Sequence, residues 1–151
     1  MIAKTARRLH WCLAALISIT IGLGTAVSAA AAADSLKVRL STVPIDPATR
    51  ATVTGSGTAA GSLDGMKLKL EGSFSGLHSP AHGAHLNLGP ARGVRGPKIH
   101  DVTVPAAPNG TFRVEITLTP EEADAVRRGQ VYLQIDSENA PEGSLWGWLL
   151  E

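Results

Sequence analysis

The stretch from Thr111 to Glu122 has the sequence Thr-Phe-Arg-Val-Glu-Ile-Thr-Leu-Thr-Pro-Glu-Glu, and it contains two structural signals. In residues 111–118 apolar and polar side chains alternate, which is the pattern of a half-buried β-strand. In residues 119–122 the order Thr-Pro-Glu-Glu is a capping box, typical of the start of a helix. The helix should be short, because Gly129 suits the left-handed residue that ends many helices.

The same alternation recurs along most of the chain, and turn-forming residues separate the alternating stretches. Strands are predicted near residues 36–40, 51–60, 66–74, 84–88, 102–104, 111–118, 131–136 and 145–150. The third of these places Met66 on the apolar face. Asp64-Gly65 and Asn109-Gly110 are expected to form turns. We therefore predict an all-β protein of seven or eight strands with one short helix.

The first 33 residues differ in composition from the rest of the chain. They contain three basic residues, no acidic residue, a long apolar stretch and the chain's one cysteine, Cys12. This composition predicts a helical secretory signal peptide over residues 1–33, followed by one domain over residues 34–151. The domain is thus expected to be secreted or periplasmic. If the signal is not cleaved, it would serve as an N-terminal membrane anchor, the only predicted membrane contact.

The predicted domain is slightly acidic, with 11 Lys and Arg against 13 Asp and Glu. Nucleic-acid binding normally needs a basic surface, so we expect no nucleic-acid partner. The domain also has no cysteine nucleophile, no Gly-x-Ser-x-Gly nucleophile elbow and no phosphate-binding loop. We therefore predict that it is not an enzyme and has no catalytic residues.

Several motifs resemble the CHRD (chordin-type) domain, as found in exported bacterial proteins. They are Phe74-Ser-Gly-Leu, Ala84-His-Leu-Asn, Leu118-Thr-Pro-Glu-Glu, Arg128-Gly-Gln-Val-Tyr-Leu and Pro141-Glu-Gly-Ser-Leu-Trp-Gly. The resemblance covers most of residues 55–150. It implies an antiparallel Greek-key β-sandwich or barrel, more distantly similar to copper/zinc superoxide dismutase. It also implies a binding or structural module in the cell envelope or outside the cell.

The chain departs from the family pattern at four positions. Asn87 replaces the second histidine of a His-x-His motif, and Asp136 stands where the family has another histidine. Ser144 replaces a glutamate and Trp146 an arginine in the closing strand. These departures affect four positions on which a polar family site would be built.

The segment from His78 to Asn87 is the one stretch where residue spacing suggests metal chemistry. Its histidines could simply be loop and packing residues, in which case the protein has no cofactor. The alternative is a weak copper or zinc site that uses His82, His85 and Asp136, a degenerate form of a superoxide-dismutase-like site. His100 is the other histidine of the predicted domain that could contribute.

Trp146 and Trp148 share one face of the last predicted strand, and Tyr132 lies on the preceding one. If these faces adjoin and point outward, they form a recognition surface for a protein, a carbohydrate or an apolar ligand. If they point inward, the aromatic side chains are core. The sequence leaves both alternatives open.

Overall fold

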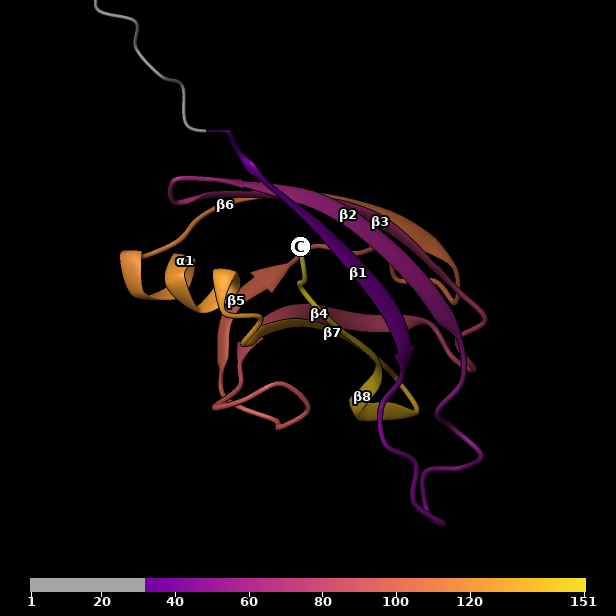
Figure 1. Cartoon of the computed structure of the whole chain (residues 1–151). Coiled ribbons are helices and arrows are strands. Elements are labelled where there is room, and N and C mark those ends of the chain that lie inside the picture. Colours follow the sequence, from indigo (N-terminus) through magenta and orange to yellow (C-terminus); the bar gives the residue numbers. More distant parts are fainter. Residues whose placement is uncertain (1–31) are drawn as a thin grey trace, which may run out of the picture. The chain divides into compact units, whose positions relative to one another are not determined.

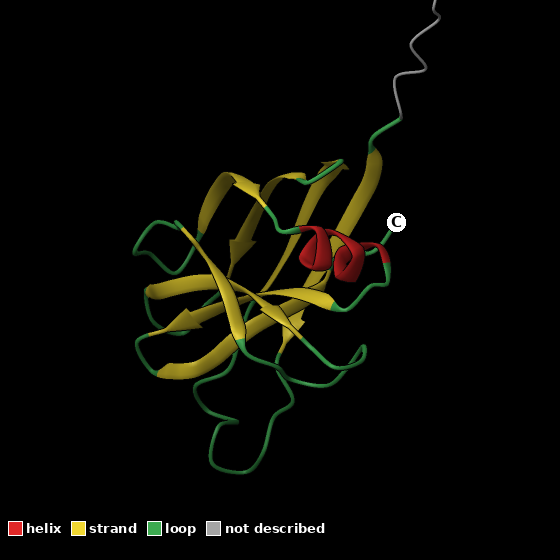
Figure 2. Ribbon diagram, turned by 90° about the vertical axis from the view of Figure 1, so that its left-hand side faces the viewer, coloured by secondary structure: helices red, strands yellow, loops and turns green. Residues whose placement is uncertain are grey.

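The computed structural model describes residues 32–151, so the predicted signal-peptide helix lies outside the described residues. The described part contains eight strands and one helix (Figures 1 and 2). The strands are β1 (Asp34–Thr42), β2 (Ser56–Asp64), β3 (Lys67–Ser75), β4 (Ala81–Leu88), β5 (Lys98–Val102), β6 (Gly110–Thr117), β7 (Val131–Ser137) and β8 (Ala140–Trp148). The helix α1 spans Pro120–Arg127. Within residues 32–151, no helix is both long and apolar enough to cross a membrane.

All strand pairs are antiparallel, and the strands follow the order β5-β4-β7-β8-β1-β2-β3-β6 in one sheet. The sheet curls into a nearly closed barrel, with β5 and β6 as its two edges. In Figure 1, β1, β2, β3 and β6 form one layer, and β4, β5, β7 and β8 form the other. The prediction of an antiparallel all-β barrel is confirmed.

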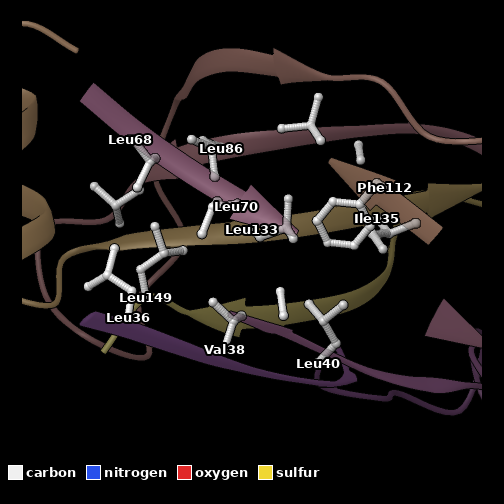
Figure 3. Packing of buried hydrophobic residues seen from close by; sticks show 14 of the residues in the cluster. Leu36, Val38, Leu40, Leu68, Leu70, Leu86, Phe112, Leu133, Ile135 and Leu149 are labelled. Carbon is white, nitrogen blue, oxygen red and sulfur yellow. The ribbon is translucent and has the colours of Figure 1, made fainter. Parts of the chain in front are cut away.

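The core lies between these two layers, and both contribute alternate residues to it (Figure 3). From β1 come Leu36, Val38 and Leu40, and from β7 come Leu133 and Ile135, all at most 2% exposed. A stretch in which every second residue is apolar can bury one face of a strand and leave the other face in water. The core members of the described part lie within residues 36–149 and belong to one compact unit.

Helix α1 begins and ends as the sequence predicts. The Thr119 hydroxyl accepts the Glu122 backbone N–H at 3.2 Å, and the Glu122 carboxylate accepts the Thr119 N–H at 2.9 Å. Gly129 has a φ of 65°, the left-handed conformation expected after the helix. Ala123, Ala125 and Val126 are buried in the barrel core, so the helix packs its apolar side against the sheet.

The second predicted strand is displaced along the chain. It was expected near residues 51–60, but β2 begins at Ser56. The reason is local: the Asp46 carboxylate accepts the backbone N–H groups of Ala48 and Thr49, both at 2.8 Å, and this folds the preceding segment into turns.

The other differences concern where elements end. Met66 belongs to the turn between β2 and β3 rather than to the apolar face, and it is 46% exposed. The turn is therefore Gly65-Met66, one residue later than predicted, and Asp64 pairs with Lys67. Strand β5 ends at Val102, and β8 covers Ala140–Trp148 instead of residues 145–150. It starts early because β7 and β8 form a tight hairpin in which Ser137 pairs with Ala140.

Candidate functional site

The outer face of the β4–β7–β8 sheet carries the candidate site. Along β7, Val131, Leu133 and Ile135 point into the core, so Tyr132 and its alternate neighbours lie on the opposite face. That face would be in water if the sheet were uncovered. All seven residues of β7 are nevertheless buried, so other parts of the chain cover this outer face as well.

Three aromatic side chains lie together there, and we call Tyr132, Trp146 and Trp148 the aromatic cluster. The strand register brings them together, because Tyr132 pairs with Trp148 and its neighbour Gln134 pairs with Trp146. The Tyr132 ring centroid lies 4.7 Å from that of Trp148 and 5.7 Å from that of Trp146. The two indole centroids are 6.0 Å apart. These separations are typical of rings in favourable tilted and edge-to-face contact.

The loop between β4 and β5, residues 89–97, covers one side of the aromatic cluster. The Gly96 backbone N–H donates to the Tyr132 hydroxyl at 3.2 Å, and that hydroxyl lies 3.4 Å from the Gly96 carbonyl oxygen. A side chain on Gly89 would come within 2.8 Å of the Trp148 ring, so only glycine permits this close approach. The loop thus packs over Tyr132 and Trp148 on the outer face of the sheet and holds both side chains in place.

A small second core covers the other side of the cluster. Val43, Val53 and Ala140 are buried together, and Trp146 packs against them. As a result Tyr132 is only 1% exposed, whereas Trp146 and Trp148 are each half-buried. The two alternatives from the sequence are both partly realised: Tyr132 is buried, although outside the main core, and the two tryptophans are still partly open to solvent.

Polar side chains border the aromatic cluster. The Gln134 amide donates to the Asp136 carboxylate at 2.8 Å, and His85 Nδ1 lies 3.4 Å from the other oxygen of Asp136. Burial raises the pKa of Asp136 above its ordinary value. The hydrogen bond from Gln134 and the nearby His85 and His82 oppose this rise without cancelling it, and Glu142 adds to it.

The buried side chain of Asn87 lies beside this border, because Asn87 pairs with Tyr132 across β4 and β7. Its amide nitrogen is the one buried side-chain polar atom in the described residues that lacks a hydrogen-bond partner. A buried donor without a partner is costly, so the Asn87 amide nitrogen lowers the stability of this region.

The structure also shows site residues that the sequence analysis did not identify. Arg95, in the covering loop, donates to the Glu142 backbone oxygen at 2.8 Å, and so ties that loop to the start of β8. These residues are 47 positions apart, and no local pattern connects them. Alternation along the strand does place Gln134 on the face of Tyr132 and Asp136, but it does not show the hydrogen bond from Gln134 to Asp136.

The proposed metal ligands are only partly brought together. His85 and Asp136 adjoin, but no group of three or more His, Cys, Asp or Glu side chains suited to a metal occurs within residues 32–151. His100 lies elsewhere: its Nε2 is 3.1 Å from the Glu122 carboxylate of α1. Because full zinc and copper centres use three or four protein ligands, His85 and Asp136 alone do not complete such a centre.

The Glu122 carboxylate is held by its contact with His100 and by the capping box of helix α1. Burial alone would raise the pKa of Glu122, but hydrogen bonds from Thr119 and the neighbouring His100 outweigh it and lower the pKa. His100 is thus engaged in fixing α1 to β5.

The described residues thus form an eight-stranded antiparallel barrel with an aromatic cluster on its outer face. The CHRD domain family model matches residues 27–149, and the chain belongs to this family. Family membership indicates a binding or structural module. No curated protein and no solved structure gives a significant match, so the distant similarity to copper/zinc superoxide dismutase finds no support there.

Two positions that depart from the family pattern have clear roles in this chain. The Ser144 hydroxyl lies 2.7 Å from that of Ser137, and both are buried, so a neutral hydrogen bond occupies this place on β8. Trp146 belongs to the aromatic cluster and contacts Tyr132. At both positions an uncharged side chain stands where the resemblance led us to expect a charged one.

Proposed function

We propose that the protein is an exported, non-enzymatic CHRD domain that acts as a binding module in the cell envelope or outside the cell, and that the aromatic cluster is its recognition surface. The observation that carries this proposal is the position of the cluster. Trp146 and Trp148 lie outside the main core, in mutual contact and half-buried.

The chemistry of the surroundings favours a carbohydrate as the partner. Aromatic rings offer apolar faces against which a sugar ring can pack. The neighbouring Gln134, Asp136 and His85 supply the few hydrogen-bonding groups that fix orientation in such sites. A protein segment is the other class of partner that such a surface suits.

A glycan array probed with labelled protein of residues 34–151 tests this proposal. We expect binding to at least one group of glycans, and we expect Trp148→Ala to reduce it at least tenfold. Met66→Ala is a matched control, because it also removes a large apolar side chain that is partly exposed, on a turn outside the aromatic cluster. If no glycan binds, the carbohydrate assignment is wrong; equal binding by Trp148→Ala would refute the recognition surface.

Export is proposed from the composition of residues 1–33. Cell fractionation followed by mass spectrometry of the N-terminus tests it. We expect the protein in the envelope or the medium, beginning near Asp34. An intact N-terminus in the cytosolic fraction would refute export.

A weak copper or zinc site at His85 and Asp136 is the second candidate, and the 3.4 Å contact between them is the observation in its favour. Two such ligands leave a metal mostly coordinated by water, so we expect only weak binding. Titration calorimetry with each metal is the test: a dissociation constant tighter than about a millimolar, which is only about −4 kcal/mol, would support a specific site.

A further inference from the structure

Strand β6 is an open edge of the barrel. Of the two edge strands, β5 has five residues, and α1 contacts it through Glu122 and His100. Strand β6 has eight residues and pairs only with β3. Within residues 32–151, no backbone hydrogen bond joins residues 111–117 to anything beyond that pairing. A long edge of this kind is a template for another strand.

The core-facing side of β6 is also incompletely covered. Val114 and Ile116 are half-buried, unlike the fully buried core residues Leu68 and Leu70 with which they pair on β3. A further strand beside β6 would complete the cover over both aliphatic side chains.

The outward-facing side of β6 carries Arg113 and Glu115, which are 82% and 59% exposed. Each already has a partner on β3: Arg113 pairs with Glu71, and Glu115 lies 3.5 Å from Lys69. Charged side chains on an edge strand often prevent pairing with other chains. Here the two charges are of opposite sign and two residues apart, so their effect depends on the strand that approaches.

We propose that β6 pairs antiparallel with β6 of a second copy of this chain, in a two-fold symmetric dimer centred on Val114. In that register Arg113 lies opposite Glu115 of the second copy, and the contact occurs twice by symmetry. Charge then alternates along a row from Lys69 to Glu115 of one copy and on to Arg113 and Glu71 of the other. Opposite charges directly across a strand pair stabilise it.

The same charges exclude the neighbouring registers. If the pairing is centred on Arg113, that residue faces itself in the second copy; if it is centred on Glu115, the two glutamates face each other. Like charges directly opposite are destabilising, so the Val114-centred register is selected. The edge is thus complementary in charge to the same edge of a second copy.

Analytical ultracentrifugation of residues 34–151 tests the proposal, over about 1 to 500 µM, because an interface of one strand pair is at the small end of the range. We expect a monomer–dimer equilibrium that shifts toward monomer at high salt. Arg113→Glu and Glu115→Arg, each alone, place like charges opposite each other and should remain monomeric. Arg39→Glu is the matched control, since Arg39 is exposed on the interior strand β1, and it should dimerise as the unaltered protein does.

Mixing the two variants gives the sharpest test. In a mixed dimer, both glutamates of the Arg113→Glu copy face both arginines of the Glu115→Arg copy, so an equimolar mixture should recover the dimer mass. Circular dichroism confirms that each variant is folded. The proposal is overturned if the unaltered protein is monomeric throughout, if either single variant still dimerises, if Arg39→Glu also becomes monomeric, or if the mixture stays monomeric.

Discussion

The replacement Tyr132→Phe tests whether the aromatic cluster and its covering loop form one unit. It keeps the ring and removes only the hydroxyl that contacts the Gly96 N–H at 3.2 Å and the Gly96 carbonyl at 3.4 Å. The second contact is long and contributes little. The first is an ordinary hydrogen bond, with a net value of about 1 kcal/mol.

The lost hydroxyl also leaves the partly buried Gly96 N–H without a partner, which costs up to about 1 kcal/mol more. The free energy of unfolding should therefore fall by about 1–2 kcal/mol. For a domain of this size that corresponds to a decrease in melting temperature of roughly 4–8 °C. The structural effect should be confined to the loop of residues 89–97, which loses its attachment to Tyr132. Tyr132 itself stays packed between Trp146 and Trp148.

Urea unfolding of residues 34–151 measures the first effect, and amide hydrogen exchange at Gly96 measures the second. We expect faster exchange at Gly96 with unchanged exchange in β1. Thr58→Val is the control, because it removes an exposed hydroxyl on β2 and should change stability by less than about 0.5 kcal/mol. An unfolding free energy within about 0.3 kcal/mol of the unaltered protein, with unchanged exchange at Gly96, would show that the hydroxyl does not hold the loop.

Three further predictions concern the helix cap, a titrating group and the tryptophans. Thr119→Ala removes one half of the capping box and should destabilise the protein by about 1 kcal/mol in urea unfolding, while Thr119→Ser should have little effect. The pKa of Asp136 is raised above its ordinary value of 3.8 in the folded state, so the folded protein holds the Asp136 proton more tightly than the unfolded chain does. The contribution of Asp136 to the free energy of unfolding should therefore fall as the pH rises from 3.8 through the folded-state pKa. The free energy of unfolding, measured across this pH range, should fall less in Asp136→Asn than in the unaltered protein. An equal fall in both would show that Asp136 is not the titrating group. Trp146 and Trp148, the tryptophans of residues 34–151, should show emission between the buried and solvated limits and partial quenching by acrylamide, whereas a fully resistant band would place both in the core.

Most of the fold could be predicted because its signals are local. Alternation of apolar and polar side chains identifies a half-buried strand wherever the partner strand lies, and it located β1, β3, β6 and β7 well. The capping box was predicted correctly because it depends on two side chains three residues apart. Strand β2 was misplaced because its composition is weakly apolar, and the Asp46 turn before it has no hydrophobic pattern.

The candidate site was less predictable, because its parts come together from distant segments. Alternation correctly placed Tyr132, Gln134 and Asp136 on one face of β7, but it could not show what covers that face. The covering loop reaches it through Gly96 and Arg95, and each contact joins residues more than 30 positions apart. The same limit applied to His100, which shares a strand parity with core residues and contacts α1 rather than the other histidines.

The sequence by itself determined the all-β class, the helix with its cap, and which side chains share each strand face, since all of these follow from the geometry of neighbouring residues. Only the tertiary structure decided the strand order, which puts β6 at an edge. Only the tertiary structure, again, showed that Tyr132 is buried while Trp146 and Trp148 remain partly exposed. The physical reason is that pairing order and loop coverage depend on packing between segments far apart in the chain, and spacing along one strand does not encode that packing.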